Sequence, residues 1–384
     1  MYNYRQEINM PPINILIKPA SSACSIGCSY CFYKDVAAHR EHGFEGMLTS
    51  DMMEKVIAAG MEYADSVCSF AFQGGEPTLA GLDFYRQILE IEQRYQKPGV
   101  EIRNSIQTNG MLIDEEWARF FAENRFLVGL SLDGPADIHN LNRTDLQQRG
   151  TFNMVMKTVR LFRKYQVDFN ILCVLTGKNA RSIEKIFRFY QKEDFRWLQF
   201  IPCLAPLDNK GKNPVWALSE DDYAFFLVKI FDLWFSEFSK GNYYSIRHLD
   251  NWLSMMLGEP PESCNMAGYC SIQYVIEGNG AVYPCDFYVL DEWDLGTVGE
   301  QTFADMMKSQ KAKDFLTVSR AVPEVCRNCR WYPLCRNGCR RERDENGLNI
   351  HCKAVHRFFD TRYPQMQQAA IMVNRTRMGN IYIK

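Results

Sequence analysis

The sequence lacks the features that mark membrane-bound, secreted and nucleic-acid-binding proteins. No stretch approaches the ~20 apolar residues of a membrane span, and the N-terminal MYNYRQEINMPP has neither the basic nor the apolar region of a signal peptide. Lysine and arginine number 44 against 46 acidic residues, so no excess positive charge favours nucleic acid or an anionic membrane. With 24 glycines and 15 prolines in 384 residues, a collagenous or low-complexity chain is excluded. We therefore expect a globular, cytoplasmic protein with no membrane and no nucleic-acid partner.

Cysteine is the residue that the sequence has in excess. Of its 14 cysteines, three lie within residues 24–31, eight lie within residues 264–352, and Cys68, Cys173 and Cys203 fall elsewhere. An even count would allow seven disulfides in a secreted protein, but without a signal peptide clustered cysteines indicate metal binding. The three isolated cysteines lie in or at the start of apolar runs, and we predict that they are small core residues.

Short apolar runs alternate with segments of helical spacing over the first two hundred residues or so. Strands are predicted at 14–17, 67–72, 101–107, 126–132, 167–175 and 197–202. Helices are predicted at 51–63, 82–95, 114–123, 153–165, 182–191 and 221–238. This alternation predicts an α/β fold whose parallel sheet is curled into a barrel or part of one. We place the first domain at residues 1–240, and a cysteine-rich domain with a C-terminal helix at residues 241–384.

Notable loops follow the first four predicted strands. They are the cysteine segment 24–31, GGEP at 74–77, TNG at 108–110 and DGP at 133–135. In parallel α/β sheets the chemistry collects at the carboxyl ends of the strands, so we expect these loops to meet at one edge. In the second domain, EGNGAV at 277–282 predicts a hairpin, and the scarcity of long periodic segments implies that metal holds the shape.

The first cysteines, Cys24, Cys28 and Cys31, have the spacing C-x3-C-x2-C. Three thiolates can hold a [4Fe-4S] cluster and leave one iron open, and an open position is typical of a catalytic metal centre. A zinc site is the alternative, with His39 or His42 as the fourth ligand. The position of the motif, where a strand passes into a loop, favours iron and sulfur.

The second group has eight cysteines, the number that two fully ligated four-iron clusters require. Full ligation leaves no open iron, so such clusters would carry electrons or support the fold. One or two four-cysteine zinc sites are the alternative, although the spacers in C-x2-C-x5-C-x3-C are short for a zinc ribbon. The group consists of Cys264, Cys270, Cys285, Cys326, Cys329, Cys335, Cys339 and Cys352.

These motifs resemble known families. The first triad, with Tyr30 inside it and GGEP after the second strand, resembles the radical S-adenosylmethionine (SAM) superfamily, whose fold is a partial (β/α)6 TIM-like barrel. The later cysteine pattern is similar to the SPASM extension of that superfamily. Segments 70–81, 131–143, 198–206 and 282–291 resemble anaerobic sulfatase-maturating enzymes, which oxidise a sulfatase cysteine or serine to Cα-formylglycine without dioxygen. The resemblance covers nearly the whole chain.

The resemblance implies SAM and three [4Fe-4S] clusters as cofactors. The first triad would hold the SAM-binding cluster. The first auxiliary cluster would use Cys264, Cys270, Cys285 and Cys339, and the second Cys326, Cys329, Cys335 and Cys352. The glycines of GGEP would let backbone approach the methionyl amino group, although GGEP alone is only a turn sequence. The implied SAM contacts are Tyr30, Gly74, Gly75, Glu76, Ser131, Arg143 and Leu204.

The resemblance also implies a mechanism and partners. A 5'-deoxyadenosyl radical would abstract hydrogen from the substrate Cβ, Asp286 would act as general base, and an auxiliary cluster would take an electron. A turn or capping role is the alternative for Asp286, and Gln73 is a weaker candidate for substrate contact. The implied partners are a sulfatase polypeptide and a flavodoxin- or ferredoxin-type electron donor. We predict a monomer.

Other functions remain open on the sequence. Another SPASM enzyme would form a thioether, an epimer or a crosslink in a peptide, commonly with a separate recognition domain for which no spare segment is evident. A non-catalytic electron-transfer or zinc-binding interaction protein would not cleave SAM. The sequence does not distinguish a cysteine from a serine substrate. Six arginines near the second auxiliary site could attract an acidic donor, bind nucleic acid or form a solvated basic face: Arg327, Arg330, Arg336, Arg340, Arg341 and Arg343.

Overall fold

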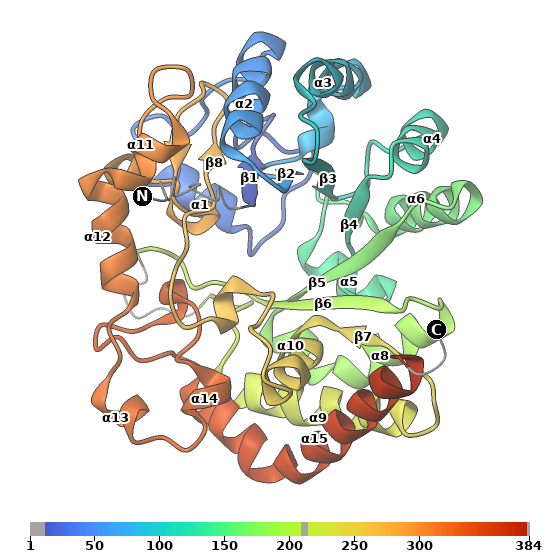
Figure 1. Cartoon of the computed structure of the whole chain (residues 1–384). Helices are drawn as coiled ribbons and strands as arrows, with labels where there is room; N and C mark the ends of the chain where they lie inside the picture. The colour runs from blue at the N-terminus through green and yellow to red at the C-terminus, as the bar shows by residue number, and fades with distance from the viewer. Residues whose placement is uncertain (1–11, 209–213, 382–384) are drawn as a thin grey trace.

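The computed structural model describes residues 12–208 and 214–381 and is built around one sheet. The sheet has nine strands in the order β7-β6-β5-β4-β3-β2-β1-β8-β9. Strands β1 to β6 pair in parallel with their neighbours and form an arc, with helices α2, α3, α4 and α6 on its outer side (Figure 1). The strands of the arc are β1 (Ile13–Ile17), β2 (Val67–Phe72), β3 (Glu101–Thr108), β4 (Leu127–Ser131), β5 (Phe169–Leu175) and β6 (Trp197–Pro202).

The helices that link these strands form where apolar residues recur with helical spacing. In α3 (Leu82–Tyr95), for example, Phe84, Tyr85, Ile88 and Ile91 are buried against the sheet, while intervening residues face solvent. The Asp114 carboxylate accepts hydrogen bonds from the first backbone N–H groups of α4 (Glu115–Glu123) and fixes its start. The other helices of this type are α2 (Ser50–Tyr63), α6 (Phe152–Tyr165), α8 (Ile183–Lys192) and α9 (Glu220–Phe238).

The predicted alternation of strands and helices is therefore confirmed, with ends that differ by two residues or fewer. The isolated cysteines are confirmed as core residues, because Cys68, Cys173 and Cys203 are buried. Several helices escaped prediction, since each is too short or too irregular to show a period. These are α1 (Phe32–Ala38), α5 (Ala136–Asn142), α7 (Gly177–Arg181), α10 (Arg247–Met256), α11 (Phe303–Lys308), α12 (Gln310–Ser319), α13 (Glu324–Arg327) and α14 (Tyr332–Cys335).

The chain beyond residue 240 extends the same sheet at both edges. Strand β7 (Ser245–Ile246) pairs with β6, and β8 (Val275–Ile276) pairs in parallel with β1. The predicted hairpin is confirmed, because β8 turns back into β9 (Val282–Tyr283), which pairs with it antiparallel. The boundary between residues 240 and 241 stays a prediction, since both proposed domains contribute strands to this sheet.

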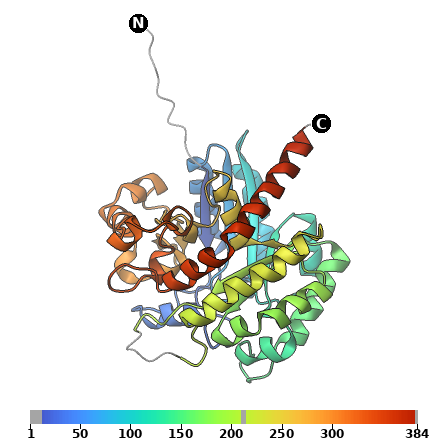
Figure 2. The same cartoon turned by 90° about the horizontal axis from the view of Figure 1, so that it is seen from below.

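The C-terminal helix, α15 (Cys352–Ile381), lies along α9 (Figure 2). Its Phe358 is fully buried, stacks on Trp252 of α10 with ring centroids 5.0 Å apart, and meets Phe231 of α9 edge-on. These aromatic contacts fix the first turns of α15, which begin at a cysteine of the second group. Among residues 12–208 and 214–381, no helix combines the length and the apolar character needed to span a bilayer.

Candidate active site

The first three cysteines lie in the loop between β1 and α1. Burial raises the pKa of the Cys28 thiol to about 12, and nearby Cys31 and Cys24 add to the rise. Cys31 directly precedes α1. The three sulfurs are therefore neighbours, as one cluster would require. All fourteen cysteines carry free thiols in the structure.

The GGEP segment after β2 holds this loop in place. The Gly75 N–H donates to the Ser21 carbonyl oxygen over 2.9 Å, and the Glu76 N–H donates to the Ala23 carbonyl oxygen over 2.8 Å. A Cβ on Gly75 would lie 1.9 Å from that Ala23 oxygen, so no other residue fits. GGEP therefore contacts the residues immediately before Cys24.

Glu76 connects GGEP to the TNG loop. Its buried carboxylate accepts hydrogen bonds from the Thr78 and Thr108 hydroxyls and from the Asn109 N–H. The Asn109 amide then lies 3.7 Å from the Cys24 sulfur. The Glu76 carboxylate is thus engaged within the protein, and its contact with SAM remains a prediction. Asn109 was missed from the sequence, although TNG was noted as a loop.

A second group of charged side chains lies beside Cys28. Tyr30 donates a hydrogen bond to Asp133, and the Arg143 Nε lies 3.0 Å from the same carboxylate. Arg143 also lies over the Tyr30 ring, 5.5 Å from its centroid, and its Nη1 is 3.9 Å from the Cys28 sulfur. The fully buried Asp133 therefore holds two predicted SAM contacts together. The sequence marked the DGP loop but not the role of its aspartate.

Three other predicted contacts lie at the carboxyl edge of the sheet. Ser131 ends β4, Leu204 follows β6, and Gln73 follows β2 with its N–H bonded to the Ile17 carbonyl oxygen. The four notable loops thus meet at this edge, as expected for a parallel sheet.

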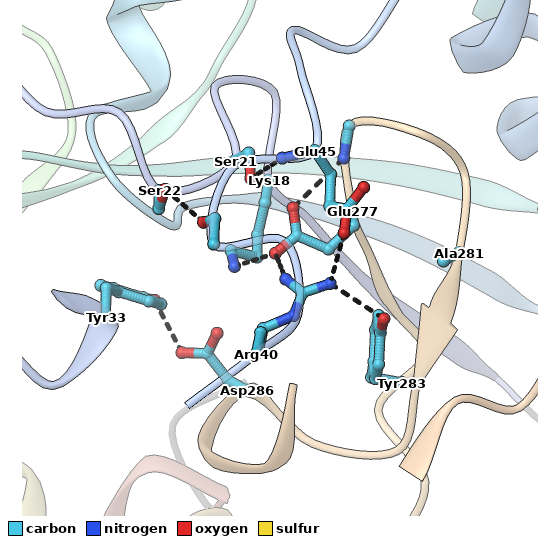
Figure 3. A network of polar contacts seen from close by, with 12 residues as sticks. Lys18, Ser21, Ser22, Tyr33, Arg40, Glu45, Glu277, Ala281, Tyr283 and Asp286 are labelled. Atoms are coloured by element: carbon cyan, nitrogen blue, oxygen red, sulfur yellow. Dashed lines mark hydrogen bonds and ion pairs between the residues drawn. The ribbon is translucent and has the colours of Figure 1, made fainter. Parts of the chain in front are cut away.

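Asp286, at the start of a short 3-10 helix, is hydrogen-bonded to Tyr33 of α1 (Figure 3). It follows Cys285 and is 8% exposed. Its Oδ2 accepts a 2.6 Å hydrogen bond from the Tyr33 hydroxyl, whereas Oδ1 has no hydrogen-bond partner within the described part of the chain. Burial raises the pKa of Asp286 to about 6, against the opposing effects of Tyr33 and Lys18. Tyr33, two residues after Cys31, carried no signal in the sequence.

A buried ion cluster joins the first loop to the β8–β9 hairpin. The fully buried Glu277 carboxylate pairs with Lys18, and it accepts a 2.8 Å hydrogen bond from Arg40. Arg40 also donates to the Tyr283 hydroxyl over 3.0 Å, and it pairs with Glu45 at 3.1 Å (Figure 3). These contacts join residues far apart in sequence, which is why single-sequence patterns did not find them.

The eight later cysteines separate into two groups of four. Burial raises the pKa of Cys339, and Cys264 and Cys270 add to the rise; burial does the same for Cys285, with Cys339 and Cys264 adding. Burial likewise raises the pKa of Cys335 to about 11, and Cys352, Cys326 and Cys329 add to it. We call Cys264, Cys270, Cys285 and Cys339 the first quartet, and Cys326, Cys329, Cys335 and Cys352 the second quartet. The partition of these cysteines between two clusters and their ligand roles remain predictions.

The second quartet lines a cavity of about 600 Å³, together with Trp331, Tyr332 and His356. A single zinc ion with four sulfurs at about 2.3 Å needs no such space, so this cavity fits an iron-sulfur cube better. His39, a possible zinc ligand for the first triad, instead places its Nδ1 2.7 Å from the Asp35 carbonyl oxygen.

The solvated basic face considered for the six arginines is wrong for three of them. Arg340 lies about 5 Å from the rings of Tyr288, Trp293 and Phe315. Arg341 donates to the Ala205 carbonyl oxygen, and Arg343 donates to several carbonyl oxygens around the quartets. These guanidinium groups hold loops together.

Comparison with known proteins finds relatives along nearly the whole chain. Residues 19–190 match the radical SAM superfamily, and residues 264–330 match an iron-sulfur cluster-binding domain. The chain is 44% identical over 366 residues to a cysteine-type anaerobic sulfatase-maturating enzyme of Clostridium novyi, covering 94% of this chain and 98% of the relative. A serine-type enzyme of Bacteroides thetaiotaomicron is 32% identical over 380 residues, covering 92% and 90%.

The solved structure of native anSMEcpe with bound AdoMet and Cp18Cys peptide is similar over the same length. Its TM-score is 0.90 at 43% identity, with 94% of this chain and 100% of that chain covered. The match to the cluster-binding domain ends before Cys335, Cys339 and Cys352, so the assignment of these three depends on the quartets described above.

Proposed function

The chain belongs to the anaerobic sulfatase-maturating enzymes, radical SAM enzymes with a second iron-sulfur domain, and from this premise we propose that its substrate is a cysteine-type sulfatase. The reaction of the family is oxidation of a sulfatase side chain to Cα-formylglycine. Cysteine-type relatives are 44% and 45% identical to this chain, whereas the serine-type relative of Bacteroides thetaiotaomicron is 32% identical. The higher identity over a similar span supports a cysteine substrate.

The donor sets fit the cofactors of this family. When bound, SAM and its cluster supply the 5'-deoxyadenosyl radical that removes a hydrogen atom from the substrate Cβ, and an auxiliary cluster receives one electron. The triad of Cys24, Cys28 and Cys31 is proposed to hold the SAM-binding cluster, and the two quartets the auxiliary clusters. Around the SAM site, Asp133 orients Tyr30 and Arg143. The other proposed SAM contacts are Gly74, Gly75, Glu76, Ser131 and Leu204.

Asp286 is proposed to accept the proton of the reaction. Once the Cβ has lost a hydrogen atom, loss of the thiol proton and one electron converts the CH–SH radical into a thioaldehyde. Water then replaces sulfur by oxygen, and hydrogen sulfide leaves. The Asp286 Oδ1 is the oxygen available for this proton, since Oδ2 already accepts from Tyr33. Gln73, at the end of β2, is proposed to contact the substrate.

The position of Asp286 is the observation that supports the proposed reaction. It follows a cysteine of the first quartet, and it is hydrogen-bonded to a tyrosine two residues from the first triad. A base at this point can reach a substrate that lies between the site where the radical forms and the site that takes the electron.

We further propose the partners and setting of the enzyme. A flavodoxin- or ferredoxin-type protein would supply single electrons, and the substrate is a sulfatase polypeptide. The enzyme is proposed to act as a monomer in the cytoplasm, where reducing conditions prevent disulfide formation and leave its cysteines able to bind iron.

The test compares matched cysteine and serine sulfatase peptides, incubated with reduced, reconstituted enzyme and SAM and analysed by mass spectrometry. We expect the cysteine peptide to be converted to the aldehyde. Asp286→Asn should still release 5'-deoxyadenosine but form formylglycine roughly 10²-fold more slowly, because its general base is lost. Asp314→Asn, on an exposed helix face, is the control. Unchanged product formation by Asp286→Asn would refute the role of Asp286, and conversion of the serine peptide alone would refute the substrate assignment.

A further inference from the structure

Arg343 makes an unusual set of contacts between the two quartets. Its Nε donates to the Asn337 carbonyl oxygen over 3.2 Å, and its Nη1 donates to the Ser319 carbonyl oxygen over 2.7 Å. Its Nη2 donates to the carbonyl oxygens of Gly268 over 2.9 Å and Gly338 over 3.0 Å. Four of the five guanidinium N–H groups therefore bind main-chain carbonyls.

These carbonyls belong to the loops that carry the cysteines. Gly268 lies two residues before Cys270, and Gly338 directly precedes Cys339, so both lie in the first quartet's loops. Asn337 lies two residues after Cys335 of the second quartet. The Ser319 hydroxyl in turn accepts a 2.9 Å hydrogen bond from the Cys270 N–H. One side chain thus fixes the backbone next to both quartets.

The charge of Arg343 also acts on both quartets. Its guanidinium group donates to carbonyl oxygens within two residues of Cys270, Cys339 and Cys335. Arg341 lies 4.0 Å from the Asp35 carboxylate, whereas Arg343 forms no ion pair with any residue in the described part of the chain. Among the described residues, no carboxylate within 4.0 Å pairs with its positive charge.

A cation in this position favours reduction of a neighbouring cluster. Four thiolates make an iron-sulfur cluster anionic, and reduction adds a further negative charge. A guanidinium held nearby stabilises the reduced form more than the oxidised form, so it raises the reduction potential.

We propose that Arg343 is a positioning residue that clamps the loops of both auxiliary clusters together and raises the reduction potentials of both. The inference rests on the proposed function, because it needs both quartets to hold four-iron clusters. It goes beyond that function by naming a residue that positions the loops of both clusters and raises both reduction potentials.

The experiment measures potentials, not turnover. In full-length protein with Cys24, Cys28 and Cys31 replaced by alanine, about eight irons should remain in the two auxiliary clusters. Redox titration monitored by electron paramagnetic resonance then gives the midpoint potential of each. Arg343→Gln should lower both potentials, and Arg343→Lys, which keeps the charge, should lower them less. Arg327→Gln, at an exposed residue beside Cys326, is the control and should change neither.

Several outcomes would overturn the proposal. These are unchanged potentials in Arg343→Gln with full iron content, a shift in only one cluster, or an equal shift in Arg327→Gln. Loss of auxiliary iron from both Arg343 variants would indicate a folding role alone and would also count against it. Failure of the proposed function would give a different result: the parent protein would bind zinc in place of iron, or it would form no formylglycine.

Discussion

The glycine at position 75 lets the chain pass close to the first cysteine loop. A methyl group on Gly75 would lie 1.9 Å from the Ala23 carbonyl oxygen, so Gly75→Ala must displace that loop. We expect the variant to lose the iron of the SAM-binding cluster, about four of roughly twelve irons, and to keep the auxiliary iron. Iron analysis and 5'-deoxyadenosine release check this. Gly27→Ala is the matched control, because a Cβ there meets Lys34 at an ordinary 3.7 Å. Full iron content in Gly75→Ala would contradict the steric argument.

Glu92 is a buried acid outside the candidate site, and its raised pKa predicts that the stability of the fold depends on pH. Burial raises its pKa from 4.5 to about 7, against a hydrogen bond from Asn104. The raised pKa means that the folded state favours the protonated acid. The contribution of Glu92 to the free energy of unfolding is therefore fully present below the pKa of this acid in the unfolded state. It is lost as the pH rises through about 7.

Glu92→Gln should remove this loss, because glutamine stays neutral. The difference in thermal midpoint between Glu92→Gln and the parent should therefore grow from about pH 5 to about pH 8. At the higher pH it corresponds to up to roughly 3 kcal/mol in the free energy of unfolding. Differential scanning measurements of the reconstituted protein at both pH values test this. Glu90→Gln, on the exposed side of the same helix, should show no such trend. A pH-independent difference for Glu92→Gln would contradict the interpretation.

Among the elements, the β8–β9 hairpin has a direct bearing on the site, because Asp286 follows it three residues after β9 and Glu277 anchors it. Removing the Glu277 charge leaves Lys18 and Arg40 buried without their shared carboxylate. Breaking one partner of a buried ion cluster costs about 3–5 kcal/mol. Glu277→Gln should therefore lower the thermal midpoint, and it should release more 5'-deoxyadenosine per formylglycine as Asp286 shifts. Glu300→Gln, at an exposed position, is the control. An unchanged midpoint and product ratio would count against this anchoring role.

The helix α15 connects packing to the second quartet. Its first residue is Cys352, and its buried Phe358 packs on α9 and α10. The position of a thiol is thus set by aromatic contacts made by the helix that begins with it. The sequence indicated both the C-terminal helix and Cys352, but it did not show that the packing of the helix positions the thiol.

At the scale of the whole molecule, the two proposed domains share one sheet but differ in what holds them. One apolar core, including the buried Phe70, Phe72 and Phe121, fills the strand-rich part and continues into the later segment at Tyr274, Phe303 and Trp331. The segment from Cys264 to Cys352 has few long elements and carries both quartets. Its shape should therefore depend on bound metal far more than the barrel does.

Removing iron with a chelator under reducing conditions should expose this difference. We expect limited trypsin digestion of the iron-free protein to cut first within residues 264–352, and to leave the barrel segment largely intact. Mass spectrometry of the fragments locates the cuts, and the iron-loaded protein is the control. Early cuts spread evenly over the strands of the barrel would contradict the expected dependence on metal.

Local patterns in the sequence determined the barrel, the hairpin and the grouping of the cysteines into three and eight. Alternating periods specify strands and helices, and close spacing of thiols marks the two regions that bind metal, so neither depends on distant contacts. The roles of Asp286 and of the SAM contacts came from resemblance, and they remain proposals.

Only the tertiary structure decided which distant side chains complete the site. Asp133 joins Tyr30 to Arg143, Tyr33 holds Asp286, and Arg343 bridges the quartets. Each of these depends on a bond between segments that the fold brings together, and a buried polar group gives no periodic signal before its partner is known. The sequence by itself therefore determined the elements and the sulfur chemistry, whereas the pairing of β8 with β1 brings the segment that leads to Asp286 beside the strand that leads to the triad.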